Sequence, residues 1–106
     1  MVERISIIIP THNEEKRISR TLENYIPYFW ELKKQGKIDF EIIAVLNNCK
    51  DKTLEVVQKY KCKELKILDF KQGGKGFAII KGFEEALKGD STLFGFVDAD
   101  MATPPN

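Results

Sequence analysis

Two aspartates near the end of the sequence have the spacing to hold a divalent cation together. Asp98 and Asp100 are one residue apart and directly follow an apolar segment, residues 93–97. Mg2+ and Mn2+ prefer oxygen ligands and usually keep water and phosphate oxygens in their other positions, so an ion here would bridge the protein and a diphosphate. The alternative is a solvated acidic loop in which Asp100 caps a following turn. An isolated Asp-x-Asp pattern favours that alternative, whereas the position at a strand end favours the metal site.

A second candidate is the glycine-rich segment Gly73-Gly74-Lys75-Gly76, which follows another apolar segment and opens a helical pattern. Glycine lets a backbone approach a ligand closely, and the start of a helix offers free N–H groups at its positive end. Lys75 adds a point charge that suits phosphate. The spacing differs from the Walker pattern. A phosphate-binding loop and a flexible connection into a helix are both consistent with these residues.

Polar residues also follow the first apolar segment, in the order Pro10, Thr11, His12, Asn13, Glu14. Thr11 or Asn13 is placed to cap the helix that comes next, and the carboxylate of Glu14 is favourable near the positive end of that helix. The functional interpretation is that Thr11, Asn13 and Glu14 also face a nucleoside. His12 fits a loop residue better than a ligand.

The second apolar segment is followed by a polar turn, residues 47–51, which leads into a helix that Asp51 can cap. Asn47 carries both a hydrogen-bond donor and an acceptor, so it can also recognise the edge of a base. Cys49 has no general base near it in the sequence, and no nucleophilic role is predicted for it.

The elements that must position these residues alternate in type along the chain. Short segments rich in β-branched residues are typical of strands buried on both faces, and longer amphipathic segments are typical of helices. The predicted strands cover residues 5–9, 40–46, 65–68 and 93–97, and the predicted helices cover residues 14–36, 52–61 and 76–88. This β-α-β-α-β-α-β order predicts an α/β fold with three α-β-α layers and a mainly parallel sheet. Ligands bind such sheets at the carboxyl ends of the strands, where all the candidate residues fall.

Three residues are expected to shape the helices. Pro27 predicts a kink or a break near Tyr25 and Ile26, because proline removes a helical hydrogen bond. Gly36 and Gly89 are placed to end the first and third helices.

Composition excludes several classes of protein. The chain has 106 residues, of which 42% are hydrophobic and 31% charged, as in a globular domain. A formal net charge of +1 gives no electrostatic reason to expect a nucleic-acid partner. The two cysteines lack paired spacing, so reduced thiols are expected rather than a zinc site. No apolar run approaches the roughly 20 residues needed to cross a bilayer. A cytoplasmic location is expected, or the cytosolic face of a membrane for a full-length protein.

Four segments in this order resemble the inverting glycosyltransferase family 2, which has the Rossmann-like GT-A fold. They are residues 7–15, 45–53, 74–76 and 97–100, so the resemblance covers essentially the whole chain. The stretch 98–105 is most similar to the polyprenyl-phosphate (dolichyl-phosphate) glucosyl- and mannosyltransferase branch. The resemblance implies that residues 1–106 are the nucleotide-sugar-binding part of such an enzyme. This part would lack the acceptor-binding half and would be inactive alone.

The resemblance also implies a mechanism and a set of site residues. A UDP- or GDP-sugar would be bound by Pro10, Thr11, Asn13, Glu14, Asn47, Gly74, Lys75 and Asp98. Asp98 would contact the ribose or assist the metal, and Asp100 would ligate Mg2+ or Mn2+, so both would act in catalysis. The metal would neutralise charge on the departing diphosphate. A phosphate or hydroxyl group of the acceptor, a lipid phosphate or a saccharide, would attack the anomeric carbon from the opposite face.

Two positions depart from the family pattern. Leu46 and Asn47 stand where the family often has two acidic residues, one of which contacts the base, and this leaves the choice of nucleotide open. Ala102 stands where the mannosyl branch often has a glutamine, which favours a glucosyl-like or other branch.

Two other functional classes fit parts of the pattern. A sugar-phosphate nucleotidyltransferase would need a glycine-rich, basic segment after the first strand, which residues 10–14 do not provide. A non-catalytic nucleotide- or partner-binding domain would leave Asp98 and Asp100 as solvated charges. For every class, a four-stranded sheet with a free edge predicts self-association, as a homo-oligomer, through that edge.

Overall fold

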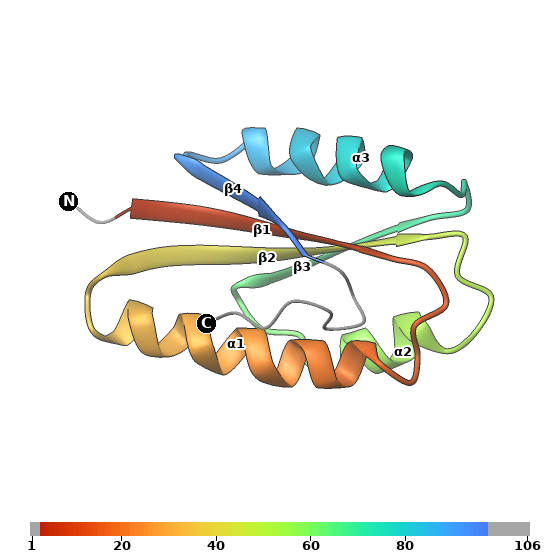
Figure 1. Ribbon diagram of the computed structural model, residues 1–106, viewed down its shortest axis with the longest axis horizontal. Helices are drawn as coiled ribbons and strands as arrows, with labels where there is room; N and C mark the ends of the chain where they lie inside the picture. The colour runs from red at the N-terminus through yellow and green to blue at the C-terminus, as the bar shows by residue number, and fades with distance from the viewer. Residues whose placement is uncertain (1–2, 98–106) are drawn as a thin grey trace.

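The computed structural model describes residues 3–97 and folds them around one sheet (Figure 1). The elements are β1 Glu3–Thr11, α1 Ile18–Lys34, β2 Ile38–Asn47, α2 Thr53–Gln58, β3 Leu65–Phe70, α3 Lys75–Leu87 and β4 Leu93–Phe96. The strands are all parallel and run in the order β3-β2-β1-β4. α1 and α2 cover one face of the sheet and α3 covers the other, which makes three layers. The predicted α/β class and element order are confirmed.

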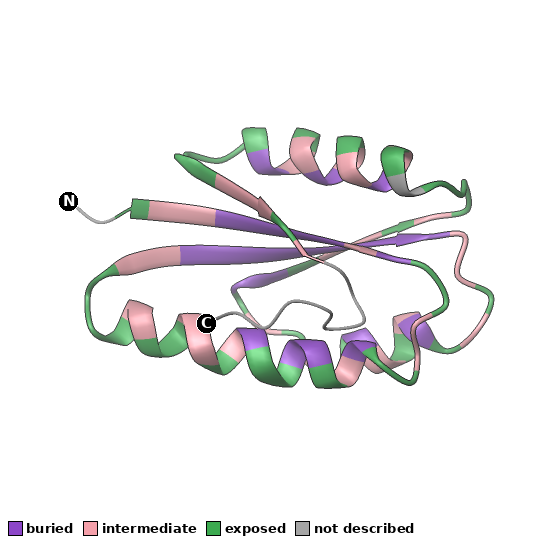
Figure 2. Cartoon of the chain, viewed as in Figure 1, coloured by how far each residue is buried: buried purple, intermediate pink, exposed green. Residues whose placement is uncertain are grey.

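The central strands are buried on both faces, as Figure 2 shows. Along β1, Ile7 and Ile9 belong to the core under α1, whereas Ile8 belongs to the core under α3. Ile42 and Ile43 of β2 divide in the same way. Successive side chains of a strand point to opposite faces, so a strand between two helical layers must be apolar at every position. The continuous apolar runs of the sequence follow from this arrangement.

The first helix differs from its predicted form. It begins at Ile18 instead of residue 14, and it continues through Pro27 without the predicted break. Ile18, Leu22 and Tyr25 are buried and pack against the sheet as one stripe. Tertiary packing of such a stripe supplies most of the stability of a helix, so it outweighs the single hydrogen bond that the proline removes. Of the two outcomes predicted at this position, a kink or a break, the break is wrong.

The predicted helix ends are confirmed. α1 ends at Lys34, and Gly36 follows in a left-handed conformation with a φ of 77°. The Gly36 N–H donates to the carbonyl oxygen of Lys33 at 2.9 Å. Gly89 lies two residues beyond α3, and its N–H donates to the carbonyl oxygen of Ala86 at 3.2 Å.

α3 approaches the sheet closely at Gly82. A Cβ atom added there would lie 2.4 Å from Ile8 Cγ2 and 3.1 Å from Val45 Cγ2, too near for both side chains to stay in place. A glycine inside a helix costs roughly 0.5–1 kcal/mol relative to alanine. The close contact with the sheet explains why α3 has a glycine at this position. The periodicity of the sequence alone did not reveal this contact.

The strand order places the candidate residues at one edge of the sheet. The chain passes from β1 outward to β2 and β3, and then returns to the other side of β1 with β4. Because all pairings are parallel, the loops after the strands emerge at the same edge. We call this edge, with loops 12–17, 48–52 and 71–74, the carboxyl edge, and the opposite one the amino edge.

Candidate functional site

The loop after β1 is held by side chains that follow β2. The Glu14 N–H donates to Thr53 Oγ1 at 2.9 Å, and the Glu15 N–H donates to Asp51 Oδ2 at 3.3 Å. Arg17 occupies the N-cap position of α1 and makes no side-chain capping hydrogen bond. The cap predicted from within the first loop is therefore wrong. Side chains from a neighbouring loop take the place of a local cap, and only the fold brings them there.

Asp51 organises both loops. Its Oδ1 accepts the N–H of Thr53 at 3.0 Å and also accepts the Thr53 hydroxyl. The sequence predicted Asp51 as the cap of α2. Lys52 holds the N-cap position instead, and Asp51, one residue earlier, accepts the N–H of Thr53, the first residue of the helix. Burial alone would raise the pKa of Asp51. The hydrogen bonds from Thr53 and Glu15 outweigh burial and hold this pKa below its ordinary value.

Asn13 joins the same two loops. Asn13 and Asn48 adopt left-handed backbone conformations, with φ values of 50° and 54°, which asparagine tolerates better than most residues. Asn13 Oδ1 accepts the N–H of Lys50 at 2.7 Å, and the Asn13 N–H lies 3.4 Å from Cys49 Sγ. Asn13 therefore has a structural role in addition to any contact with a ligand.

His12 has a role in the structure that the sequence did not reveal. Its Nδ1 lies 2.8 Å from the backbone carbonyl oxygen of Asn47. A carbonyl oxygen can only accept, so Nδ1 carries a proton, and Nε2 is an acceptor when the ring is neutral. Asn13 Nδ2 lies 3.4 Å from this Nε2 and can donate to it, so the exposed ring also links His12 to Asn13. No sequence signal marks the bond to Asn47, because the partner is a backbone atom 35 residues away.

Asn47 has an unsatisfied polar atom. The residue is 4% exposed, and its side-chain Oδ1 has no hydrogen-bond partner within residues 3–97. A buried polar atom without a partner costs roughly 1–3 kcal/mol. The same side chain is the predicted base contact. Its oxygen has almost no exposed surface, so a donor from a ligand reaches it only if neighbouring atoms move.

Thr11 and Pro10 lie at the end of β1. The Thr11 side chain is fully buried, and its hydroxyl donates to the carbonyl oxygen of Ile9 at 3.0 Å. The whole residue, backbone included, has no exposed surface, so the predicted contact of Thr11 with a nucleoside has no support in this structure. Pro10 is partly exposed.

The glycine-rich loop lies beside the loop after β2. A Cβ atom added to Gly73 would lie 3.5 Å from Asn48 Nδ2. Gly74 occupies the N-cap position of α3 with a φ of 106°, a conformation that other residues rarely adopt. α3 begins directly afterwards at Lys75, so the predicted opening of a helix by this segment is confirmed. The side chain of Lys75 lies outside the described part of the structure.

An open pocket of about 350 Å³ lies beside the first loop. It includes the predicted site residues Asn13 and Glu14, but not Asn47 or Gly74. The Glu14 carboxylate pairs with the guanidinium of Arg17. The full lining is Asn13, Glu14, Glu15, Lys16, Arg17 and Asp51.

Asp98 and Asp100, the predicted metal ligands, lie outside the described residues. Val97 is the last described residue, and its N–H donates to the carbonyl oxygen of Ile8 in β1 at 3.1 Å. Between residues 3 and 97, no three His, Cys, Asp or Glu side chains gather as a metal site would require.

Family comparison decides the identity of the domain. The model of the family described as Glycosyl transferase family 2 matches residues 6–106. The chain belongs to glycosyl transferase family 2. The matched region contains every candidate site residue, and the family suggested by the four sequence segments is confirmed.

Several family 2 relatives are named as dolichol-phosphate sugar transferases. A dolichyl-phosphate beta-glucosyltransferase of Trichomonas vaginalis is 37% identical over 103 residues, which cover 93% of this chain and 31% of the relative. The dolichyl-phosphate beta-glucosyltransferase of Homo sapiens is 33% identical, with 95% and 32% covered. The dolichol-phosphate mannosyltransferase of Pyrococcus furiosus is 33% identical, with 96% and 27% covered. The chain thus spans about a third of the length of these relatives.

A solved structure supports the same fold. The crystal structure of S. aureus TarS 1-349 matches this family 2 domain with a TM-score of 0.68 and 27% sequence identity. The match covers 92% of this chain and 27% of that one.

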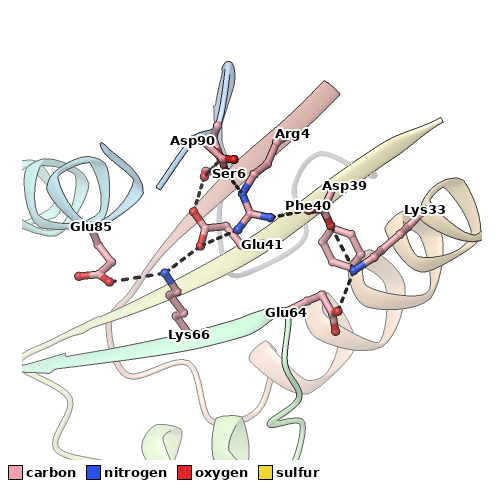
Figure 3. Close-up of polar contacts among 11 residues, drawn as sticks. Arg4, Ser6, Lys33, Asp39, Phe40, Glu41, Glu64, Lys66, Glu85 and Asp90 are labelled. Atoms are coloured by element: carbon pink, nitrogen blue, oxygen red, sulfur yellow. Dashed lines mark hydrogen bonds and ion pairs between the residues drawn. The ribbon is translucent and has the colours of Figure 1, made fainter. Parts of the chain in front are cut away.

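The family 2 domain also carries a cluster of charged side chains at the amino edge (Figure 3). Arg4 pairs with Asp39 at 2.6 Å, and Ser6 donates to Glu41 at 2.5 Å. In both pairs the residues are opposite each other in the register of β1 and β2. The Glu41 side chain is 3% exposed. Its Oε1 accepts no hydrogen bond from the described residues, but it lies 3.1 Å from Lys66 Nζ and forms an ion pair with it.

α1 joins this cluster through Lys33, whose Nζ lies 3.0 Å from Glu64 and 3.1 Å from Asp39. Hydrogen bonds to Glu64 and Asp39 raise the pKa of Lys33. Burial alone would raise the pKa of Asp39, but bonds from Lys33, the Phe40 N–H and Arg4 outweigh burial and lower it. No predicted site residue belongs to this cluster. We call Arg4, Ser6, Lys33, Asp39, Glu41, Glu64 and Lys66 the amino-edge network.

Proposed function

We propose that this chain forms the nucleotide-sugar-binding part of a family 2 glycosyltransferase. The reaction is transfer of a sugar, with inversion, from a UDP- or GDP-sugar to a polyprenyl (dolichyl) phosphate. The observation that carries the proposal is the carboxyl edge, where polar loops meet and the buried Asn47 Oδ1 lacks a donor. The names of the relatives support a lipid-phosphate acceptor. A saccharide is the alternative acceptor.

Each loop of the carboxyl edge binds one part of the donor in this proposal. Asn47 accepts an N–H group of the base, and Asn13 and Glu14 line the pocket on the nucleoside side. Gly74 lets the diphosphate approach the start of α3, where backbone N–H groups are free. Lys75 adds a positive charge to the same end of the helix.

Asp98 and Asp100 are the residues that would hold Mg2+ or Mn2+. Two carboxylates supply the hard oxygen donors that these ions prefer, and β4 ends two residues before Asp98, in the parallel direction that leads to the carboxyl edge. A bound ion would supply Lewis-acid assistance by neutralising charge on the departing diphosphate. Asp98 is also the proposed ribose contact.

The proposed reaction exchanges one bond at the anomeric carbon for another. An oxygen of the acceptor phosphate forms a bond to that carbon while the bond to the diphosphate oxygen breaks, and the diphosphate leaves with the electron pair. Attack from the face opposite the diphosphate inverts the configuration. The loops described above bind and orient the donor for this step.

Calorimetry with UDP, GDP and their sugars, with and without Mn2+, tests this proposal. Asn47→Ala should weaken binding about tenfold, which corresponds to the loss of roughly 1.4 kcal/mol. Asp100→Ala should abolish the dependence of binding on metal. Asn24→Ala and Asp69→Asn are controls, because they change exposed residues of the same types elsewhere. Unchanged affinity in Asn47→Ala would contradict the base contact, and metal-independent binding of equal strength in Asp100→Ala would contradict the metal role.

Self-association through a sheet edge is part of the proposal, and surface side chains favour the β4 edge. Of the five exposed large hydrophobic side chains in residues 3–97, Ile80, Leu87, Leu93 and Phe96 lie on α3 and β4, and Trp30 lies on α1. β4 pairs only with β1 in the described sheet, so its other edge is open to a second copy. Leu93→Gln combined with Phe96→Gln should convert a dimer to a monomer in analytical ultracentrifugation, whereas Trp30→Gln should not. A monomeric unaltered chain at high concentration would contradict the dimer.

The location follows from the acceptor. A lipid phosphate resides in a membrane, so we place the full-length protein at the cytosolic face of one. None of the helices within residues 3–97 has the length and apolar character that a bilayer crossing requires.

A further inference from the structure

Exposed charge is distributed unevenly over the described surface. In the segment 50–71, seven lysines are exposed, but only two carboxylates, those of Glu55 and Asp69. In the rest of residues 3–97, Lys75 apart, six exposed basic residues are balanced by five exposed acidic ones. The surplus of positive surface charge is therefore concentrated in one segment. We call its exposed lysines the α2–β3 lysine surface: Lys50, Lys52, Lys59, Lys61, Lys63, Lys66 and Lys71.

Most of these lysines have no ion-pair partner in the described structure. Lys66 alone forms ion pairs, with Glu41 and Glu85. The other carboxylates of the segment are used elsewhere: Glu64 is 6% exposed and binds Lys33 of α1, and Asp51 accepts backbone N–H groups. Six ammonium groups therefore remain in water without a compensating carboxylate.

The position of this surface argues against a purely protective role. β3 is the outermost strand on its side of the sheet, and lysines on edge strands commonly prevent unwanted pairing. That explanation applies to Lys66, which lies within β3. It does not apply to Lys50 and Lys52, which precede α2, or to residues 59–63, which connect α2 to β3.

We propose that the α2–β3 lysine surface docks on an anionic membrane surface. This inference rests on the proposed function, in which the acceptor is a lipid phosphate. The segment 50–71 contains no arginine, and none of its aromatic residues is exposed. Nucleic-acid surfaces typically use arginine and stacking aromatic side chains. A surface of lysine ammonium groups, without arginine or exposed aromatic side chains, suits the diffuse negative potential of lipid headgroups.

The docked orientation serves the candidate site. Lys50 and Lys52 flank Asp51, which binds the first loop of the carboxyl edge. Lys71 directly follows β3 at the same edge. Lys59, Lys61 and Lys63 precede β3 and lie toward the amino edge, so the lysine surface runs along the β3 side of the sheet from one edge to the other. Attraction of the whole surface to headgroups would lay that side on the membrane, and Lys50, Lys52 and Lys71 would hold the carboxyl-edge loops at the headgroups. An aqueous donor site and a membrane-held acceptor would then meet at one surface.

Co-sedimentation with vesicles tests the docking surface without any donor, metal or dolichyl phosphate. The chain should bind vesicles of phosphatidylcholine with 30% phosphatidylserine at low salt, and it should not bind phosphatidylcholine alone. Replacing Lys59, Lys61 and Lys63 by Gln should lower the partition coefficient about a hundredfold, since each lysine near such a surface contributes roughly 1 kcal/mol. Lys50→Gln with Lys52→Gln should lower it about tenfold or more.

The matched control removes the same charge from α1 and its end, by Arg20→Gln, Lys34→Gln and Lys37→Gln, three exposed residues without ion pairs in residues 3–97. This control should retain most of the binding. Lys59→Arg, Lys61→Arg and Lys63→Arg together should bind vesicles as the unaltered chain does, because they keep the charge. No binding to anionic vesicles, or equal loss in the control, would overturn the proposal. Binding to a DNA duplex instead of vesicles, with the same dependence on these lysines, would also overturn it.

Circular dichroism melting of each variant confirms that the fold is intact. Calorimetry with UDP or GDP on the lysine variants separates the two proposals. Loss of vesicle binding with nucleotide binding retained supports the docking surface by itself. Vesicle binding without any nucleotide binding would leave the surface in place and overturn the donor site.

Discussion

The carboxyl edge and the amino edge, at the two ends of the parallel strands, satisfy their polar groups in different ways. At the amino edge, side chains pair with side chains, and Glu41 is enclosed by Arg4, Lys66 and the Ser6 hydroxyl. At the carboxyl edge, side chains of one loop bind backbone N–H groups of the next, and Asn47 Oδ1 has no donor in the described chain. The charged groups of the amino edge are compensated by its own residues, whereas the carboxyl edge has a buried acceptor without a donor in the described residues.

The elements that carry the residues explain this difference. The pairs at the amino edge are opposite in a parallel register, so two strands hold them in fixed positions. The carboxyl-edge residues lie on loops, two of which contain an asparagine at positive φ. We therefore expect the free energy of unfolding to depend more on the amino edge, and nucleotide affinity to depend more on the carboxyl edge.

The largest expected effect is that of Glu41→Ala in the amino-edge network. Removing one partner of a buried ion pair costs roughly 3–5 kcal/mol. The side chains of Arg4 and Lys66 are 27% and 43% exposed and can be hydrated, so the expected loss of unfolding free energy is about 2–3 kcal/mol. Urea denaturation measures this loss. Nucleotide affinity of the folded variant should not change.

Glu55→Ala is the matched control, because Glu55 is exposed and forms no ion pair in residues 3–97. Its unfolding free energy should change by less than about 0.5 kcal/mol. A fall in nucleotide affinity in Glu41→Ala would show that the two edges are coupled. It would contradict the assignment of stability to the amino edge and of affinity to the carboxyl edge.

Asn13→Ala should have the opposite effect to Glu41→Ala. We expect a smaller loss of unfolding free energy, together with a loss of nucleotide affinity. The change removes the hydrogen bond to the Lys50 N–H and puts alanine at a φ of 50°. Together these cost about 1–2 kcal/mol. Nucleotide affinity should fall because loops 12–17 and 48–52 lose a link between them.

Asn13→Gly separates the two causes. Glycine adopts positive φ freely, so this variant should be more stable than Asn13→Ala in urea denaturation while still lacking the hydrogen bond. Equal stability of the two variants would mean that the left-handed backbone contributes nothing. Full affinity in both would remove Asn13 from the binding role.

The smallest expected effects are those of pH. Asp51 at the carboxyl edge and Asp39 at the amino edge have pKa values below the ordinary 3.8. A lowered folded pKa stabilises the fold above the unfolded pKa, and this contribution is lost as the pH falls through the folded value. Lys33 has a raised pKa, so its contribution is complete below the ordinary 10.5 and is lost as the pH rises through its folded value. The amino edge should therefore weaken in acid through Asp39 and in alkali through Lys33. At the carboxyl edge, Asp51 gives a loss in acid, and Cys49, whose pKa is raised by burial, gives a loss in alkali as the pH rises past the ordinary 9.0.

Urea midpoints measured across the pH range check these assignments. Lys33→Gln should remove part of the alkaline loss of stability, whereas Lys34→Gln, at an exposed lysine without an ion pair in residues 3–97, should keep it. The same alkaline loss in both variants would exclude Lys33 as its source.

Local patterns were sufficient to predict the order of the strands and helices and the edge of the sheet at which the candidate loops gather. Apolar runs such as 5–9 and 40–46 identified the strands, and Gly36 and Gly89 identified helix ends. The parallel order then predicted that Asn13 and Asn47 would come to the same edge. These predictions succeed because steric preference and burial act within a few residues of the chain.

The contacts between distant residues needed the tertiary structure. Nothing near Glu14 indicates that Thr53 binds its N–H and so replaces a local helix cap, and nothing near Glu41 indicates that a carboxylate in a strand will be buried with partners. The continuity of α1 through Pro27 likewise depends on the sheet beneath it. A residue type specifies which bonds a side chain can make. Strand register and the packing of helices decide which partner, here 35 to 39 positions away, it makes them with.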